Sequence, residues 1–291
     1  METRTLPPLI DVASLAARAG DPGLRIIDLR WTLGGVPQAE KYARGHIPGA
    51  VLVLMEGELS RPGEGPGRHP LPPVADFAAL LARIGVGERT QVVVYDDATG
   101  SFAARLWFML RLHGHSRASV LDGGYSAWEE AGLPVEAGEQ ERPPAAPLRQ
   151  LVRDEAMLAD KAEVERLMAA RTQPGPRTLL LDARAQERYR GEVEPIDKRA
   201  GHIPGAVNAP FAENLAAGHF RSPDELRARY EALGANTAAQ VIASCGSGVT
   251  ACHALLALAV AGLPGGRLYV GSWSEWSSDP AAPIATGPAP G

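Results

Sequence analysis

Cysteine is scarce in this sequence, which has only Cys245 and Cys252 among its 291 residues. Two cysteines are too few for a disulfide framework of the kind that holds small secreted domains together. They lie seven residues apart, about two turns along a helix, so a bridge between them within one helix would have poor geometry. Free thiols are typical of reducing compartments, and we expect a cytoplasmic protein.

Long apolar runs and clusters of basic residues are also missing. The apolar stretch Ala251–Gly262 contains His253 and is shorter than the roughly 18 residues that a membrane span needs. The N-terminal segment has no apolar core between a basic start and a cleavage site, which argues against a signal peptide. The net charge is −5 and no Lys/Arg cluster occurs. We therefore expect neither a membrane nor a nucleic acid as a partner.

The sequence contains a tandem repeat. The segment GHIPGAV occurs at Gly45–Val51 and again, unchanged, 156 residues later at Gly201–Val207. Two further pairs of segments match at nearly the same offset: IIDLR (26–30) with LLDAR (180–184), and GGYSAW (123–128) with GSWSEW (271–276). The three pairs come in the same order in both copies. This period is too long for a solenoid, and it indicates that a whole domain has been duplicated.

Each copy alternates short apolar strands with helical segments, which predicts an α/β fold with two tandem domains. In each domain we expect a mainly parallel sheet flanked by helices, with strands at 24–29, 91–95, 118–121, 178–181, 240–244 and 267–270 and helices at 74–84, 101–112, 223–233 and 250–261. The first domain is predicted at 1–138, a Pro- and Glu-rich linker at 139–150, and the second domain at 151–291, with an irregular Pro/Ala-rich tail from about 277.

One cysteine stands where a parallel α/β domain binds its ligands. Cys245 follows a strand directly, and the loop Cys245-Gly246-Ser247-Gly248-Val249-Thr250 leads into a helix. Ligands bind beyond the carboxyl ends of parallel strands, and free N–H groups at a helix start favour an anion. The loop therefore favours a nucleophilic thiolate at Cys245 and could also hold a persulfide. The alternative is a small buried side chain with no chemical role.

The duplication suggests that only one copy carries this chemistry. When the repeats are aligned at an offset of 148 residues, Cys245 falls on Asp97 and Gly248 falls on Gly100. The first copy then keeps the bend but lacks the thiol, so we expect one catalytic domain and one silent, supporting domain.

These residues resemble the two-domain sulfurtransferases of the rhodanese superfamily over nearly the whole chain. The loop CGSGVTA is similar to that of 3-mercaptopyruvate sulfurtransferases, whereas thiosulfate sulfurtransferases typically carry CRKGVTA; both GHIPGA segments and GSWSEW are also typical of the superfamily. The resemblance implies two rhodanese-like domains, the first silent, and a ping-pong reaction. Cys245 would take sulfur from a small anionic donor as a persulfide and pass it to a thiol, a thioredoxin-like protein or cyanide.

The resemblance also implies which residues contact the donor. Arg188 matches the arginine that binds the anionic donor in the family, and a guanidinium suits a carboxylate because it donates two parallel hydrogen bonds. A second family arginine aligns near Ile196, in a segment one residue shorter than usual, and Arg199 is our candidate for its role. The loop positions Gly246, Gly248, Val249 and Thr250 are expected to bind the sulfur group.

A proton relay is implied as well. Ser247, His69 and Glu56 match the serine, histidine and acid of the mercaptopyruvate enzymes, although an aspartate is usual at the position of Glu56. Such a relay could deliver a proton to a leaving enolate.

Three other functions compete with this hypothesis. A phosphatase would need an arginine at the end of the loop, where Thr250 stands instead. A non-enzymatic sulfur-carrier or binding module would suit the first copy but not the intact loop of the second. Thiosulfate as the donor stays the closest alternative to 3-mercaptopyruvate. The cysteines and His253 lack metal-ligand spacing, so we expect no metal, no cofactor and a monomer.

Overall fold

The computed structural model describes residues 6–97, 99–139, 143–169, 177–263 and 265–291. The chain forms two compact units. The first unit consists of Met1–Ser60, Pro72–Asp154 and Ala217–Phe220, and the second consists of Arg61–Leu71, Glu155–Ala216 and Arg221–Gly291. The units differ from the expected continuous domains because 61–71 clusters with the second unit and 217–220 with the first. Among the described residues, no helix is long and apolar enough to cross a membrane.

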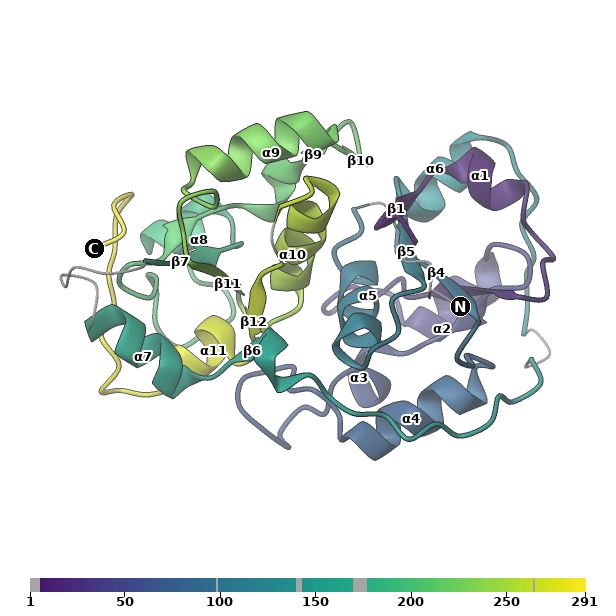
Figure 1. Ribbon diagram of the computed structural model, residues 1–291, viewed down its shortest axis with the longest axis horizontal. Helices are drawn as coiled ribbons and strands as arrows, with labels where there is room; N and C mark the ends of the chain where they lie inside the picture. Colours follow the sequence, from purple (N-terminus) through teal and green to yellow (C-terminus); the bar gives the residue numbers. More distant parts are fainter. Residues whose placement is uncertain (1–5, 98, 140–142, 170–176, 264) are drawn as a thin grey trace. The chain divides into compact units, whose positions relative to one another are not determined.

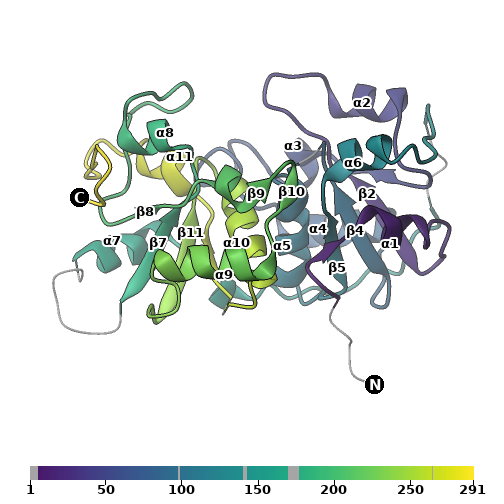
Figure 2. The same ribbon diagram turned by 90° about the horizontal axis from the view of Figure 1, so that it is seen from above.

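Each unit contains a five-stranded sheet in which all neighbouring strands are parallel, so the α/β prediction is confirmed (Figures 1 and 2). The first sheet has the order β1-β5-β4-β2-β3, with β1 Leu9–Ile10, β2 Leu24–Asp28, β3 Val51–Leu52, β4 Gln91–Tyr95 and β5 Ala118–Leu121. The second has the order β6-β12-β11-β7-β8, with β6 Leu158–Ala159, β7 Thr178–Asp182, β8 Val207–Asn208, β11 Gln240–Ser244 and β12 Arg267–Tyr269. The two orders match strand for strand, as a duplication requires.

Helices cover both faces of each sheet. The first unit contains α1 Val12–Ala16, α2 Gln38–Arg44, α3 Met55–Glu58, α4 Val74–Arg83, α5 Ala103–Leu112 and α6 Gly124–Glu130. The second contains α7 Lys161–Ala169, α8 Gln186–Arg190, α9 Pro223–Ala232, α10 Thr250–Val260 and α11 Ser272–Trp276, with 3₁₀ turns η1 Glu155–Met157 and η2 Phe211–Asn214. A short hairpin joins β9 Leu215–Ala216 to β10 His219–Phe220.

The direction of the side chains along the strands shows which helices pack on which face of the second sheet. Leu180 and Ile242 pack in one core with Trp273 and Trp276 of α11 and with Val164 of α7. Successive strand residues point to opposite faces, so Val241 and Ala243 of β11 face α10, which runs beside that strand (Figure 1). In α10 itself, every residue from Ala251 to Leu258 is buried, as expected for a helix that is apolar on all sides.

The strand ends carry the same buried ion pair in both units. Asp28 pairs with Arg30 at 2.7 Å, and Asp182 pairs with Arg184 at 2.6 Å. Each arginine also donates to the carbonyl oxygen of the first glycine of a GHIPGAV segment, Gly45 or Gly201. The ion pair thus fixes the GHIPGAV segment that leads into the edge strand, β3 or β8.

The two GHIPGAV histidines have the structural role expected of residues that occur in both copies. His46 stacks on Tyr42 and His202 on Tyr189, with ring centroids 3.8 and 3.7 Å apart. Each Nδ1 lies 2.8 Å from the carbonyl oxygen of the tyrosine on which the ring stacks. Both histidines are fully buried, and they stabilise the turn.

We expect Asp28→Ala to lower the free energy of unfolding by about 3–5 kcal/mol, because it leaves the guanidinium of Arg30 buried without its carboxylate partner. Urea unfolding followed by circular dichroism measures this loss. The matched control is Glu40→Ala, which breaks the exposed pair with Arg44 and should cost less than about 1 kcal/mol. Equal losses in the two variants would contradict a stabilising role for the strand-end pair.

Candidate active site

Cys245 lies at the carboxyl end of β11, in the loop that leads into α10. The residue is 2 % exposed. Its Sγ accepts a hydrogen bond from the backbone N–H of Ser247 at 3.4 Å, and its own N–H donates to Ser272 Oγ at 3.1 Å. The thiol is therefore enclosed by the loop, and a backbone donor already points at its sulfur.

The start of α11 holds this loop in place. The backbone N–H of Trp273 donates to the carbonyl oxygen of Cys245 at 3.0 Å, and the backbone N–H of Ser274 donates to the carbonyl oxygen of Gly246 at 2.9 Å. Ser272 adopts a φ of 50°, a left-handed conformation that is uncommon for a residue with a side chain. Strain of this kind persists only where the surroundings impose it, and here Ser272 Oγ is fixed between Tyr269 and Cys245.

The strand register shows that Asp96, and not Asp97, corresponds to Cys245 in the first unit. Asp28 of β2 pairs with Tyr95, as Asp182 of β7 pairs with Ser244. The next residue after each central strand is therefore Asp96 in the first unit and Cys245 in the second. The expectation of Asp97 is wrong because the first loop is longer than the second, and a constant offset does not survive an insertion.

Asp96 occupies the anion site of its own loop. Its carboxylate accepts hydrogen bonds from the backbone N–H groups of Gly100, Phe102 and Ala103 at 2.8–3.2 Å. Burial raises the pKa of Asp96, although these three donors act in the opposite direction. Asp97 instead forms an ion pair with Lys41 and is half exposed. The first loop thus holds a side-chain carboxylate where the second loop holds a thiol.

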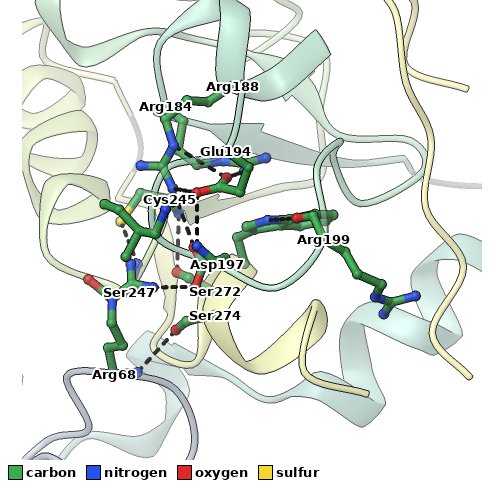
Figure 3. A network of polar contacts seen from close by, with 12 residues as sticks. Arg68, Arg184, Arg188, Glu194, Asp197, Arg199, Cys245, Ser247, Ser272 and Ser274 are labelled. Atoms are coloured by element: carbon green, nitrogen blue, oxygen red, sulfur yellow. Dashed lines mark hydrogen bonds and ion pairs between the residues drawn. The ribbon is translucent and has the colours of Figure 1, made fainter. Parts of the chain in front are cut away.

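Two guanidinium groups lie against the loop of Cys245. A Cβ placed on Gly246 would come within 3.1 Å of Arg68 Nη2 and 3.6 Å of Arg188 Nη1. Asp197 pairs with both arginines, at 3.3 Å from Arg188, and Glu194 pairs with Arg188 at 2.6 Å (Figure 3). The predicted donor-binding Arg188 therefore lies beside the loop, already engaged by carboxylates.

Arg184 connects this group to the core. It pairs with Asp182 and Glu194, and its guanidinium lies 4.6 Å from the ring centroid of Trp273. Burial alone would lower the pKa of Arg184, but the charges of Asp182, Glu194 and Cys245 raise it above its ordinary value. Arg184 has the structural role that its position at the strand end suggests.

The structure brings two members of the predicted relay together. His69 Nδ1 and Ser247 Oγ lie 2.8 Å apart, within hydrogen-bond distance, and both residues are buried. Glu56 belongs to the first unit, where it is exposed at a kink within α3. Its place in a relay with His69 stays a prediction.

The structure argues against Arg199 as a contact of the donor. Its guanidinium donates to the carbonyl oxygens of Trp276, Ser277, Asp279 and Ala282. Figure 3 shows the side chain extending away from Cys245. Arg199 fastens the segment after α11, and four of its five N–H donors are directed at these carbonyls.

Sequence reasoning missed Arg68, which lies directly before His69 in the segment GRHPLPP. Its partner Asp197 is 129 residues away in the sequence, so no local pattern pointed to the contact. Among the described residues, no group of three or more His, Cys, Asp or Glu side chains could hold a metal ion.

The rhodanese-like domain model matches the chain twice, at residues 11–131 and 160–279. The chain is similar to a probable 3-mercaptopyruvate sulfurtransferase of Pseudomonas aeruginosa, with 46% identity over 96% of this chain and 98% of the relative. It is also similar to a putative thiosulfate sulfurtransferase of Mycobacterium tuberculosis, with 42% identity over 97% and 98% of the two chains. Among solved structures, a 3-mercaptopyruvate sulfurtransferase of Escherichia coli has a TM-score of 0.80 and 34% identity, covering 93% of this chain and 100% of that one.

We expect Gly248→Ala to lower the free energy of unfolding by about 1–3 kcal/mol. Gly248 has a φ of +73°, and an added Cβ would lie 2.5 Å from the carbonyl oxygen of Val270. Thermal unfolding measures the effect. Gly265→Ala is the control, because a Cβ there meets no atom within 4 Å. A Gly248 variant as stable as the control would show that the loop has room to adjust.

Proposed function

Since the chain belongs to the rhodanese-like family, with two copies of the domain, we propose that it is a sulfurtransferase that uses Cys245 as its sulfur carrier. The observation that carries the proposal is the buried Cys245 sulfur at the carboxyl end of β11, with the N–H of Ser247 directed at it. A thiolate and a persulfide are both anions, so one backbone donor can stabilise each in turn.

We propose 3-mercaptopyruvate as the donor. The Cys245 thiolate attacks the donor's sulfur, and a new S–S bond forms while the C–S bond breaks. The bonding electrons leave on carbon as the enolate of pyruvate, which takes up a proton. In the second half-reaction an acceptor thiolate, or cyanide, attacks the outer sulfur of the persulfide. The Cys245 thiolate is released, and the acceptor carries the sulfur away.

The pair of His69 and Ser247 favours this donor. An enolate that leaves must be protonated, and a hydroxyl held 2.8 Å from an imidazole can deliver a proton. Thiosulfate would release sulfite, which needs no proton to leave. Gly246 and Ser247 are also uncharged, whereas a dianionic donor would gain from basic residues at these loop positions.

Thiosulfate is the second candidate, and a specific observation supports it. Arg68 and Arg188 both approach Gly246, and guanidinium groups bind sulfonate oxygens as well as carboxylates. Relatives of the chain carry both names. As the acceptor we propose a small thiol, a thioredoxin-like protein or cyanide, in the reducing cytoplasm.

We expect Cys245→Ala to abolish sulfur transfer from both donors, since no other residue of the loop can carry the sulfur. Steady-state transfer to cyanide measures the activity, and mass spectrometry should find one added sulfur atom on Cys245 of the wild type after treatment with the donor. Cys252→Ala is the matched control, because Cys252 is also buried but belongs to α10, and it should keep nearly full activity. Turnover by the Cys245 variant would refute the mechanism, and faster turnover of thiosulfate by the wild type would favour the second candidate.

We expect Ser247→Ala to lower kcat with 3-mercaptopyruvate by roughly 10²- to 10⁴-fold, the usual size of general acid–base catalysis. Turnover of thiosulfate should change little, because sulfite leaves without a proton. Comparing the two donors on one variant separates a proton-transfer role from damage to the loop. Ser14→Ala, which alters an exposed serine on α1 of the first unit, should leave both rates unchanged. Equal losses with the two donors would argue against the relay.

A further inference from the structure

Gly246, the residue after Cys245, has no side chain and so leaves room for two guanidinium groups. Gly246 is the glycine whose Cβ position is contacted by both Arg68 and Arg188. Any side chain at this position would have to displace Arg68 Nη2 at 3.1 Å. A donor whose sulfur reaches Cys245 would therefore have its anionic end within range of two arginines from distant parts of the sequence.

One carboxylate bridges the two guanidinium groups. Asp197 forms ion pairs with Arg68 and with Arg188, and its side chain is only 6% exposed. Two guanidinium groups that share one carboxylate form the arrangement that would bind a carboxylate ligand. Burial raises the pKa of Asp197 despite its contacts with Arg68 and Arg188, and the neighbouring charge of Glu194 acts in the same direction. The two arginines therefore stabilise the charged form of Asp197 by less than the loss of hydration destabilises it.

Arg68 is held in this position by its own segment. Its backbone N–H donates to Ser274 Oγ at 3.0 Å, and the next residue, His69, contacts Ser247. The preceding residue, Gly67, has a φ of +74°, and a Cβ there would lie 2.6 Å from the carbonyl oxygen of Gly271. The segment is thus seated directly on the start of α11, and Arg68 approaches the loop as a fixed group.

A cavity adjoins this arrangement. It has a volume of about 310 Å³ and is lined by Arg68, Asp197, Lys198 and Ser274, among others. This is the lower end of the size range of ligand pockets. The cavity reaches Arg68 and Asp197, whereas Arg188 and Cys245 do not line it. The Nε of Arg68 is buried and has no hydrogen-bond partner among the described residues, so the guanidinium keeps a donor for a ligand.

We propose that Arg68 and Arg188 together bind the carboxylate of the sulfur donor and that Asp197 occupies this site until the donor displaces it. Arg68 then supplies the second guanidinium in place of the expected Arg199, which is bound to backbone carbonyls, and of Ile196, which has no charge. The inference rests on the proposed sulfurtransferase function and assigns the binding site of its 2-oxo acid.

Two substitutions with opposite expected effects test the proposal. We expect Arg68→Gln to raise KM for 3-mercaptopyruvate roughly 10- to 100-fold, the loss that follows removal of a charge-assisted bidentate contact. Asp197→Asn removes the competing charge but keeps the shape, so it should lower KM several-fold. In both variants kcat should change much less than KM. Arg190→Gln is the matched control, since Arg190 is a partly exposed arginine of α8 that pairs with Glu192, and it should leave KM unchanged.

A binding measurement separates this proposal from the proposed function. Pyruvate, the product of the reaction, is titrated by calorimetry into the Cys245→Ser variant and into the same variant carrying Arg68→Gln. Weaker binding of pyruvate in the double variant supports the two-arginine site without any turnover. Absence of turnover by the wild type would refute the function, whereas normal turnover with unchanged KM and unchanged pyruvate affinity in the Arg68 variants would refute only the role of Arg68.

Two further outcomes are decisive. Arg68→Lys keeps the charge but loses the planar fork, so it should fold normally and show an intermediate KM; wild-type behaviour would show that no bidentate contact is made. A rise in KM in Asp197→Asn would overturn the displacement step, because Asp197 would then position the arginines for the donor instead of competing with it.

Discussion

The buried ion pair between Asp182 and Arg184 is the contact on which the rest of the site depends. Arg184 spans the distance from the sheet to the loop, because its guanidinium also reaches Glu194 and lies over Trp273. The backbone N–H of Trp273 in turn donates to the carbonyl oxygen of Cys245. A buried charge without its partner is costly, so this arginine cannot move independently. The position of the nucleophile is thereby tied to the end of the central sheet.

The first unit contains the same framework without the thiol. Asp28 and Arg30 reproduce the ion pair, and the strands have the same order in both sheets. Its loop is filled by the carboxylate of Asp96, which takes the backbone donors for itself. An anion that belongs to the chain cannot leave, so this loop cannot exchange one anion for another. The duplicated fold has therefore kept its scaffold in both copies and a thiol at the strand end in one.

The long elements could be predicted from the sequence, and the short ones could not. Strands such as β4 and β11 and helices such as α10 lie within a residue or two of their expected positions, because each is a run of apolar residues with turn residues at its ends. β1 and β6 have two residues each, too few to show any period, and only their pairing partners reveal them. In the site, Cys245, Ser247, His69 and Arg188 followed from motifs. Arg68 lies beside them through a tertiary contact that no motif encodes.

The charges around the loop are balanced, and this balance bears on the choice of donor. Three arginines and three carboxylates form one connected group, Arg68, Arg184, Arg188, Asp182, Glu194 and Asp197. A monoanionic donor that replaced Asp197 on the two outer arginines would add one negative charge to this group, because Asp197 would lose its partners. A dianion would bring one more negative charge, and neither Gly246 nor Ser247 offers a positive group to meet it. In a site with little exposure to water an unpaired charge is expensive, so the neutral loop and the balanced arginines favour the same, singly charged donor.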